Sequence, residues 1–240
     1  MAATTAPLYD NIAEEYKESK KIDFREFVEH HTLRQLLAKT HPDLVCTSAT
    51  PMPITGLAIL DLACGEGIYS RSMRRLGASE VLGVDISPEM VALAEKAEAE
   101  TPLGCEFKVG DASKLDLGAE LEGHYDIVLC AWLLQNAETD EQLRGMVADA
   151  FRYLKPGGRL VGINDWPGND QSSVDQRYQV YGFIRVPDED VSAPKKKDHP
   201  AESEDQRKPG TRFAAIVTNP DSTTFTLYFW CDPKLQTLTP

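Results

Sequence analysis

The sequence LAILDLACGEG at residues 57–67 joins a short apolar run to two glycines, Gly65 and Gly67. An apolar run of this length, bounded by glycines, is typical of a strand that is buried on both faces of a sheet. Glycines directly after a strand let the backbone approach a ligand closely, and the N-terminus of a following helix offers free N–H groups. We therefore predict a buried strand, a ligand-binding turn and a helix, in that order.

The same alternation continues along the chain. Further apolar runs of strand length are EVLGVD (80–85), CEFKVGD (105–111), YDIVLCAW (125–132) and RLVGIN (159–164). Ser87 and Pro88 begin a predicted helix after the second run, and a helical pattern up to Phe151 precedes the turn LKPGG before the last run. Strands that alternate with helices predict an α/β fold: a Rossmann-like, doubly wound, mostly parallel sheet with helices on both faces.

The flanking segments have a different composition. Residues 8–40 show helical spacing of apolar side chains, and residues 41–56 contain three prolines and read as a loop. After Pro187 the chain is charged and poor in large apolar residues, so we expect a mobile insertion over 187–210. The closing runs TRFAAIV (211–217) and TTFTLYFW (223–230) are predicted to pair as a hairpin on the edge of the sheet, with NPDS as the turn.

Composition excludes several classes of protein. The chain of 240 residues carries 25 basic and 38 acidic side chains, a net charge of −13, which disfavours nucleic acids and anionic membranes as partners. No apolar run is long enough to span a membrane, and the N-terminus does not resemble a secretory signal, so we expect a cytoplasmic protein. The five cysteines are odd in number and form no C-x-x-C pair, which predicts reduced thiols and neither disulfides nor a metal site.

Polar residues follow the predicted strands at their carboxyl ends, where parallel sheets bind ligands. The glycine turn departs from the nicotinamide fingerprint, because Ser70 stands where a third glycine is expected. Asp85 ends the second strand and can accept hydrogen bonds from both hydroxyls of a ribose; the alternative is a helix cap. Asp111 and Ala112 follow the third strand, where the carboxylate can accept a hydrogen bond from an adenine amino group; the alternative is a turn aspartate.

Taken together, these motifs resemble those of the class I S-adenosylmethionine-dependent methyltransferases over roughly residues 55–165. The motifs that carry the resemblance are DLACGEG (61–67), GVDIS (83–87), GDA (110–112), YDIVLCAWLLQNA (125–137) and FRYLKPGGRLVGI (151–163). Ala63 departs from the family by replacing its usual first glycine. The resemblance implies S-adenosyl-L-methionine as cofactor and S-adenosyl-L-homocysteine as product, with a small molecule as the methyl acceptor.

Specific roles follow from the resemblance. Asp61 would order the glycine turn, Asp85 would hold the ribose, and Asp111 would read the adenine edge. The full set of implied cofactor-binding residues is Tyr16, Asp61, Ala63, Cys64, Gly65, Gly67, Asp85, Ile86, Met90, Asp111, Ala112 and Cys130. The implied division of the chain is an N-terminal helical lid (1–56), a cofactor-binding core (57–166) and an acceptor-side segment (167–240).

The residues expected to bind the methyl acceptor follow the fourth and fifth predicted strands or lie near the N-terminus. Candidate acceptor residues are Tyr9, Trp132, Gln135, Asn136, Asp165 and Trp166. The segment YDNIAEEY (9–16) resembles a lid of small-molecule members, and its alternative is a packing helix with Tyr9, Ile12 and Tyr16 on one face. His30 and His31 could supply a base, although methyl transfer needs none when the nucleophile is already an amine, thiolate or phenolate.

Several readings of the activity stay open. The overall pattern resembles methyltransferases of secondary metabolism, including those that act on toxoflavin precursors. In such relatives a helix and further strands follow the run that TTFTLYFW resembles, whereas this chain ends at CDPKLQTLTP, so the C-terminal part of the sheet is expected to be incomplete. The alternatives are a methyltransferase-like binding protein without turnover and a nicotinamide-dependent oxidoreductase.

Overall fold

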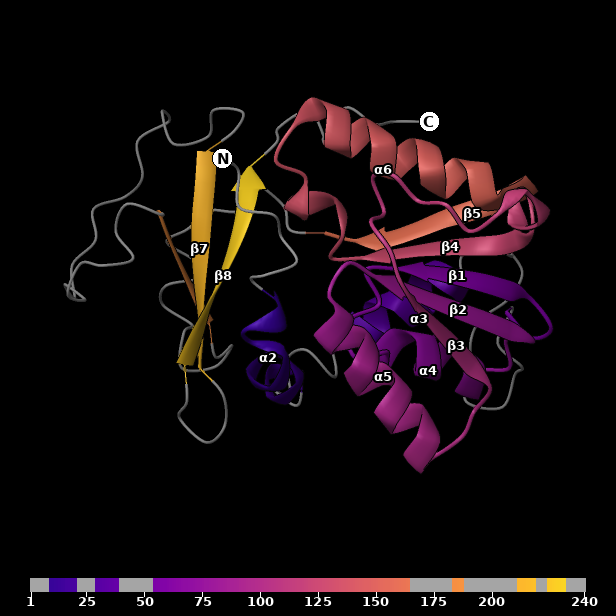
Figure 1. Ribbon diagram of the computed structural model, residues 1–240, viewed down its shortest axis with the longest axis horizontal. Coiled ribbons are helices and arrows are strands. Elements are labelled where there is room, and N and C mark those ends of the chain that lie inside the picture. The colour runs from indigo at the N-terminus through magenta and orange to yellow at the C-terminus, as the bar shows by residue number, and fades with distance from the viewer. Residues whose placement is uncertain are drawn as a thin grey trace.

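The computed structural model describes residues 9–20, 29–38, 54–164, 183–187, 211–218 and 224–231. Five strands form a parallel sheet in the order β3-β2-β1-β4-β5, which confirms the predicted α/β class (Figure 1). The strands are β1 (Ala58–Leu62), β2 (Glu80–Asp85), β3 (Cys105–Val109), β4 (Tyr125–Ala131) and β5 (Leu154–Ile163). All five residues of β1 are buried, so this strand forms the centre of the core.

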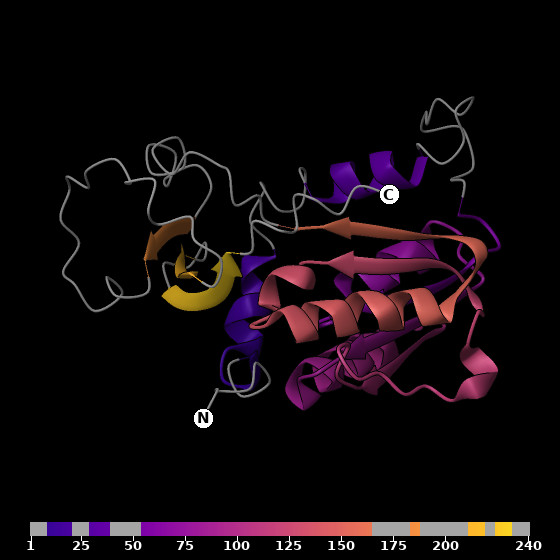
Figure 2. The same ribbon diagram turned by 90° about the horizontal axis from the view of Figure 1, so that it is seen from above.

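Helices cover both faces of the sheet, as predicted. The core-covering helices are α3 (His30–Ala38), α4 (Ile68–Arg75), α5 (Pro88–Glu100) and α6 (Asp140–Tyr153). Side chains of α3 and α4 belong to one core cluster, and side chains of α6 belong to the other. Figure 2 shows α3 and α6 on opposite sides of the sheet. The helix α5 packs against β2 and β3.

Local signals explain where the long helices begin. The Ser87 hydroxyl accepts a hydrogen bond from Met90 N, and Pro88 occupies the first helical position of α5, as predicted. Thr139 caps α6 in the same way through Gln142 N. Asp140 in the first turn of α6 adds negative charge at the positive end of the helix dipole.

The LKPGG stretch, predicted as a turn, lies inside β5. Pairing between β4 and β5 jumps from Tyr125 with Leu154 to Ile127 with Arg159, so the intervening residues 155–158 form a bulge in the strand. Gly157 adopts a φ of 80°, which glycine reaches without steric cost. The LKPGG stretch is therefore an irregular part of β5, which begins directly after α6, and is not a separate turn between the helix and the strand.

The closing strands form a second, antiparallel sheet in the order β6-β7-β8, built from β6 (Phe183–Pro187), β7 (Thr211–Thr218) and β8 (Thr224–Cys231). The predicted hairpin between β7 and β8 is confirmed, but its predicted place on the edge of the main sheet is wrong. Both edges of β7 are used inside the second sheet, by β6 and by β8. Strand β8 instead contacts α2 (Ala13–Ser19) and the short helix η3 (Leu134–Asn136) (Figure 1).

Other sequence predictions are tested only in part. Within the predicted helical stretch 8–40, α2 and α3 are helical, while residues 21–28 lie outside the described residues, as do 188–210 of the predicted insertion. Cys64, Cys105 and Cys130 are buried free thiols, as expected. Among the described residues, no helix is long and apolar enough to cross a membrane, and no cluster of side chains could hold a metal ion.

Candidate active site

One pocket lies at the carboxyl ends of the first four strands, beside the N-terminal segment. Most of the residues implied by the sequence line it: Tyr9, Tyr16, Ala63, Gly65, Asp85, Ile86, Met90, Asp111, Ala112, Trp132 and Asn136. The lining also includes residues that were not among the candidate site residues: Gly110, Ser113, Ala131, Leu133, Glu138, Gln142 and Met146. The pocket therefore lies where doubly wound sheets bind their ligands. Helix α6 forms one of its walls through Gln142 and Met146.

The turn after β1 forms the floor of this pocket. Ala63, Gly65 and Gly67 have positive φ values of 60°, 55° and 82°. A Cβ on Gly67 would lie 2.8 Å from the Phe107 ring, so only glycine fits there. Ala63 is a non-glycine residue in the left-handed region, and its place beside the pocket fits the common occurrence of such strain at functional sites.

Asp85 joins two parts of the site. Its Oδ2 accepts a hydrogen bond from Gly65 N (2.8 Å), and its Oδ1 accepts one from Ser87 N (2.9 Å). Burial raises the pKa of this carboxyl, and the two backbone N–H groups oppose that rise. Each carboxylate oxygen keeps a second lone pair, so Asp85 can still accept hydrogen bonds from a ligand in the pocket.

Asp61 lies below the turn and does not line the pocket. Its side chain is fully buried, and its Oδ2 accepts a hydrogen bond from Ser70 Oγ (2.5 Å). Burial raises the pKa of Asp61 to about 7, and its Oδ1 has no hydrogen-bond partner among the described residues. Ser70, which stands where the nicotinamide fingerprint has its third glycine, therefore binds the Asp61 carboxyl.

Four other residues implied by the sequence also stay outside the pocket lining. These are Cys64, Gly67, Cys130 and Gln135. Cys64 and Cys130 are buried thiols, and burial raises the pKa of both well above the usual value, which keeps them neutral. Cys130 packs in the core under α6, so it does not reach the pocket, whereas the next residue, Ala131, lines it. Asp165 and Trp166 lie outside the described residues.

The N-terminal segment contributes two aromatic side chains to the pocket. Tyr9 and Tyr16 meet edge to face with ring centroids 5.7 Å apart, and the Tyr9 hydroxyl donates to Asn136 Oδ1 (3.3 Å). Ile12, the third residue of the alternative packing face, does not line the pocket. Both tyrosines therefore line the pocket, and the lid stays a prediction.

A buried polar cluster fastens the end of this segment to the core. Lys20 pairs with Glu29 (3.4 Å) and stands over the rings of Tyr16 and Tyr69, 5.1 and 5.0 Å from their centroids. The Tyr69 hydroxyl also donates to Glu29. His30 packs on Tyr69 with ring centroids 5.4 Å apart, and neither His30 nor the exposed His31 lines the pocket. His30 and His31, considered from the sequence as possible bases, therefore lie outside the pocket lining.

The pocket has the groups that an adenosine-containing cofactor needs. Asp85 supplies a buried acceptor for hydroxyl groups, and Gly65 leaves the backbone open beside it. Ile86, Met90 and Ala112 give apolar surface next to Asp111, which suits a purine ring with a polar edge. The residues present therefore fit an adenosine-containing cofactor such as S-adenosylmethionine.

Comparisons with known proteins agree with this geometry. Residues 59–158 match a family model described as a methyltransferase domain. The chain is similar to a ubiquinone biosynthesis O-methyltransferase from Xanthomonas oryzae, with 34% identity over 109 residues that cover 45% of this chain and 43% of that protein. The match therefore spans less than half the length of this curated relative.

Two solved structures show the same fold. The PH0226 protein from Pyrococcus horikoshii is 22% identical with a TM-score of 0.60, and the match covers 93% of this chain and 86% of that one. The [4+2]-cyclase SpnF is 18% identical with a TM-score of 0.53, and the match covers 76% of this chain and 72% of that one. A fold shared with a protein named a cyclase does not by itself define a reaction.

Proposed function

Residues 59–158 form a class I S-adenosylmethionine-dependent methyltransferase domain, and we propose that the chain transfers a methyl group from S-adenosyl-L-methionine to a small molecule. The acceptor atom is an oxygen, nitrogen or sulfur nucleophile. The observation that carries the proposal is one pocket that gathers Gly65, Asp85 and Asp111 from the ends of three successive strands.

The residues of the chain bind and align the reactants. The bound cofactor would supply an electrophilic methyl group: the acceptor would attack the methyl carbon in line with the C–S bond, and S-adenosylhomocysteine would leave as that bond breaks. Asp85 accepts hydrogen bonds from the ribose, and Gly65 lets the cofactor lie close to the backbone. Tyr9 and Tyr16 cover one side of the pocket and exclude water, which favours a displacement between two aligned reactants.

The acceptor would bind next to Trp132 and Asn136, two residues that line the pocket. These residues follow β4, and Tyr9 approaches them from the N-terminal segment. The net charge of −13 supports a small-molecule acceptor in preference to a nucleic acid. No histidine of the described residues lines the pocket, which supports an acceptor that does not depend on a histidine base.

Calorimetric titration with S-adenosylmethionine and S-adenosylhomocysteine tests the cofactor. We expect micromolar binding by the wild-type chain and at least about a hundredfold weaker binding by Asp85→Ala, because the ribose loses its buried acceptor. Glu95→Gln, an exposed change on α5, serves as the matched control and should bind as wild type. A folded wild-type sample that binds neither compound contradicts the proposal.

A transfer assay with labelled S-adenosylmethionine then tests turnover. The first panel contains hydroxyl acceptors, because the curated relative is named an O-methyltransferase. Heteroaromatic nitrogen compounds and thiols form the second panel, which covers the resemblance to toxoflavin-type enzymes. Cofactor binding without transfer to any member of either panel supports the alternative of a binding protein without turnover.

A further inference from the structure

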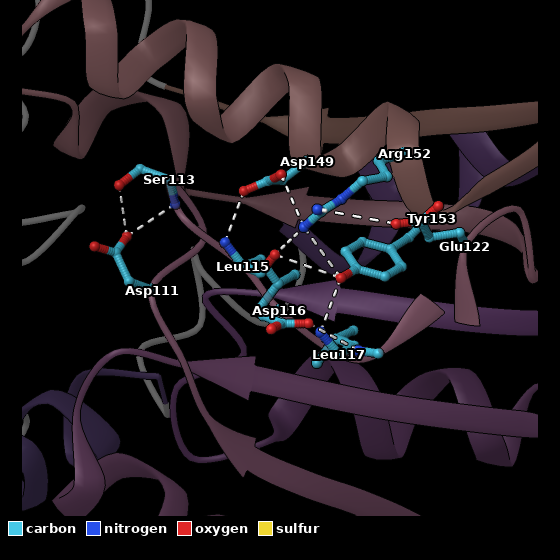
Figure 3. Close-up of polar contacts among 10 residues, drawn as sticks. Asp111, Ser113, Leu115, Asp116, Leu117, Glu122, Asp149, Arg152 and Tyr153 are labelled. Atoms are coloured by element: carbon cyan, nitrogen blue, oxygen red, sulfur yellow. Dashed lines mark hydrogen bonds and ion pairs between the residues drawn. The ribbon is translucent and has the colours of Figure 1, made fainter. Parts of the chain in front are cut away.

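Asp111 is held by one neighbouring residue through a single oxygen. Its Oδ1 accepts hydrogen bonds from both Ser113 N (2.8 Å) and Ser113 Oγ (2.7 Å) (Figure 3). Two donors on one oxygen fix both the position and the rotation of the carboxylate. Asp111 and Ser113 both line the pocket, so this arrangement lies at the ligand and not behind it.

The second oxygen of Asp111 is left for a ligand. Oδ2 points away from Ser113 and makes no hydrogen bond to any of the described residues (Figure 3). A carboxylate oxygen can only accept hydrogen bonds. Asp111 Oδ2 can therefore accept a hydrogen bond from a nucleobase bound next to Ala112.

Ser113 is itself fixed by α6. The Gly145 backbone approaches Ser113 so closely that a Cβ at Gly145 would lie 2.4 Å from Ser113 O. Two residues later, Leu115 N donates to Asp149 Oδ2 (2.7 Å), and Leu117 N donates to Tyr153 OH (2.8 Å) (Figure 3). The segment that carries Asp111 is thus fastened to α6 at successive points and cannot adjust freely to a different base.

We propose that Ser113 is a positioning residue that makes the pocket select a purine with an exocyclic amino group over one with a carbonyl group. This inference rests on the proposed function, because it takes the nucleoside end of the cofactor to lie at Asp111. The fixed Oδ2 accepts a hydrogen bond from the amino group of adenine. The carbonyl oxygen of hypoxanthine brings a second acceptor to the same point and is repelled.

The geometry also predicts what an amide at position 111 would do. In Asp111→Asn, the two donors of Ser113 bind the amide oxygen, because the amide nitrogen cannot accept a hydrogen bond from them. The nitrogen is then turned toward the pocket, where Oδ2 stood. The site presents a donor in place of an acceptor, so its preference between adenine and hypoxanthine reverses.

Titration with S-adenosyl-L-homocysteine and S-inosyl-L-homocysteine tests the inference. We expect wild type to bind the adenosyl compound at least about tenfold more tightly, and Asp111→Asn to prefer the inosyl compound. Ser113→Ala keeps one of the two donors, so its preference should shrink to about threefold, while Ser113→Thr keeps the hydroxyl and most of the preference. Ser79→Ala, an exposed change just before β2 and outside the pocket lining, is the control and should match wild type.

The outcomes separate this inference from the proposed function. A wild-type protein that binds neither compound contradicts the proposed cofactor. A wild-type protein that binds both equally leaves the cofactor in place and overturns the selectivity. A folded Asp111→Asn that shows no reversal, or a Ser113→Ala that keeps the full wild-type ratio, overturns the role of Ser113, since a purely structural role would weaken both compounds alike.

Discussion

The backbone N–H of Gly65 donates a 2.8 Å hydrogen bond to Oδ2 of Asp85, which ties the turn after β1 to the end of β2. The other oxygen of Asp85 accepts from Ser87 N. The residue proposed to hold the cofactor ribose therefore also fixes the backbone around the pocket. Substitutions of Asp85 should change the stability of the protein even without ligand.

Asp85→Asn is expected to destabilise the ligand-free protein by about 1–3 kcal/mol. Both oxygens of Asp85 accept from backbone N–H groups, so the amide must turn its own donor toward either Gly65 N or Ser87 N. Urea denaturation without ligand measures the loss. Glu95→Gln, on the exposed face of α5, should stay within about 0.5 kcal/mol of wild type. An Asp85→Asn midpoint equal to that of wild type would show that these two bonds carry no stability.

Asp61→Asn is expected to become more stable than wild type as pH rises, because wild type loses stability when Asp61 ionises and the variant does not. Burial raises the pKa of Asp61 from 3.8 to about 7, so the folded state holds a proton that the unfolded state has released. The stability from this group is full below the unfolded pKa and is lost as pH rises through the folded pKa. From about pH 5 to about pH 8, urea titrations should show Asp61→Asn gaining about 2–3 kcal/mol over wild type. A difference between the two proteins that does not change with pH contradicts this pKa.

The strands of the main sheet and the polar residues at their ends could be predicted because their signals are local. The apolar runs define β1 to β4, and Gly65, Asp85 and Asp111 follow them directly in sequence. Cys130, expected among the cofactor-binding residues, lies in the core, and its neighbour Ala131 lines the pocket. The reason is that neighbouring residues of a strand point to opposite faces of the sheet.

The contribution of α6 to the pocket could not be predicted from the sequence, because its pocket residues do not directly follow a strand. Gln142 and Met146 reach the pocket only because α6 packs closely on Ser113. One signal was available: Gly145 stands inside an otherwise helical pattern, and such a glycine usually has a packing reason. Strand β6 was missed because a short run that ends in Pro187 is a weak strand signal.

Asp149 should stabilise the segment after Asp111 mainly through Leu115 and only weakly through its ion pair. Its Oδ2 accepts from Leu115 N (2.7 Å), and its Oδ1 lies 3.1 Å from Arg152, a partly exposed side chain. Asp149→Asn keeps an acceptor for Leu115 and should cost under about 1 kcal/mol. Asp149→Ala removes both contacts and should cost about 1–3 kcal/mol. Urea denaturation compares the two, and equal losses would mean that the ion pair dominates.

A strained residue, Trp132, lies beside the proposed acceptor site. Trp132 has a φ of 66°, which is unusual for a large side chain, and both of its backbone groups are held. Its N–H donates to Ile163 O (2.7 Å), and its carbonyl accepts from Asn136 Nδ2 (2.7 Å). Asn136 Oδ1 in turn accepts from the Tyr9 hydroxyl. Asn136 therefore links the N-terminal segment to the strained turn after β4.

Asn136→Asp should loosen this turn more than Tyr9→Phe does. The aspartate keeps an acceptor for Tyr9 but sets an oxygen against the Trp132 carbonyl, whereas Tyr9→Phe removes only the 3.3 Å bond to Asn136 and keeps the ring against Tyr16. Hydrogen–deuterium exchange of a peptide spanning residues 131–137 should be fastest in Asn136→Asp, intermediate in Tyr9→Phe and slowest in wild type. Glu141→Gln, an exposed change at the start of α6, should exchange as wild type. If Tyr9→Phe exchanges as slowly as wild type, the N-terminal segment does not support the turn through Asn136, and Trp132 is held by Ile163 and Asn136 without help from Tyr9.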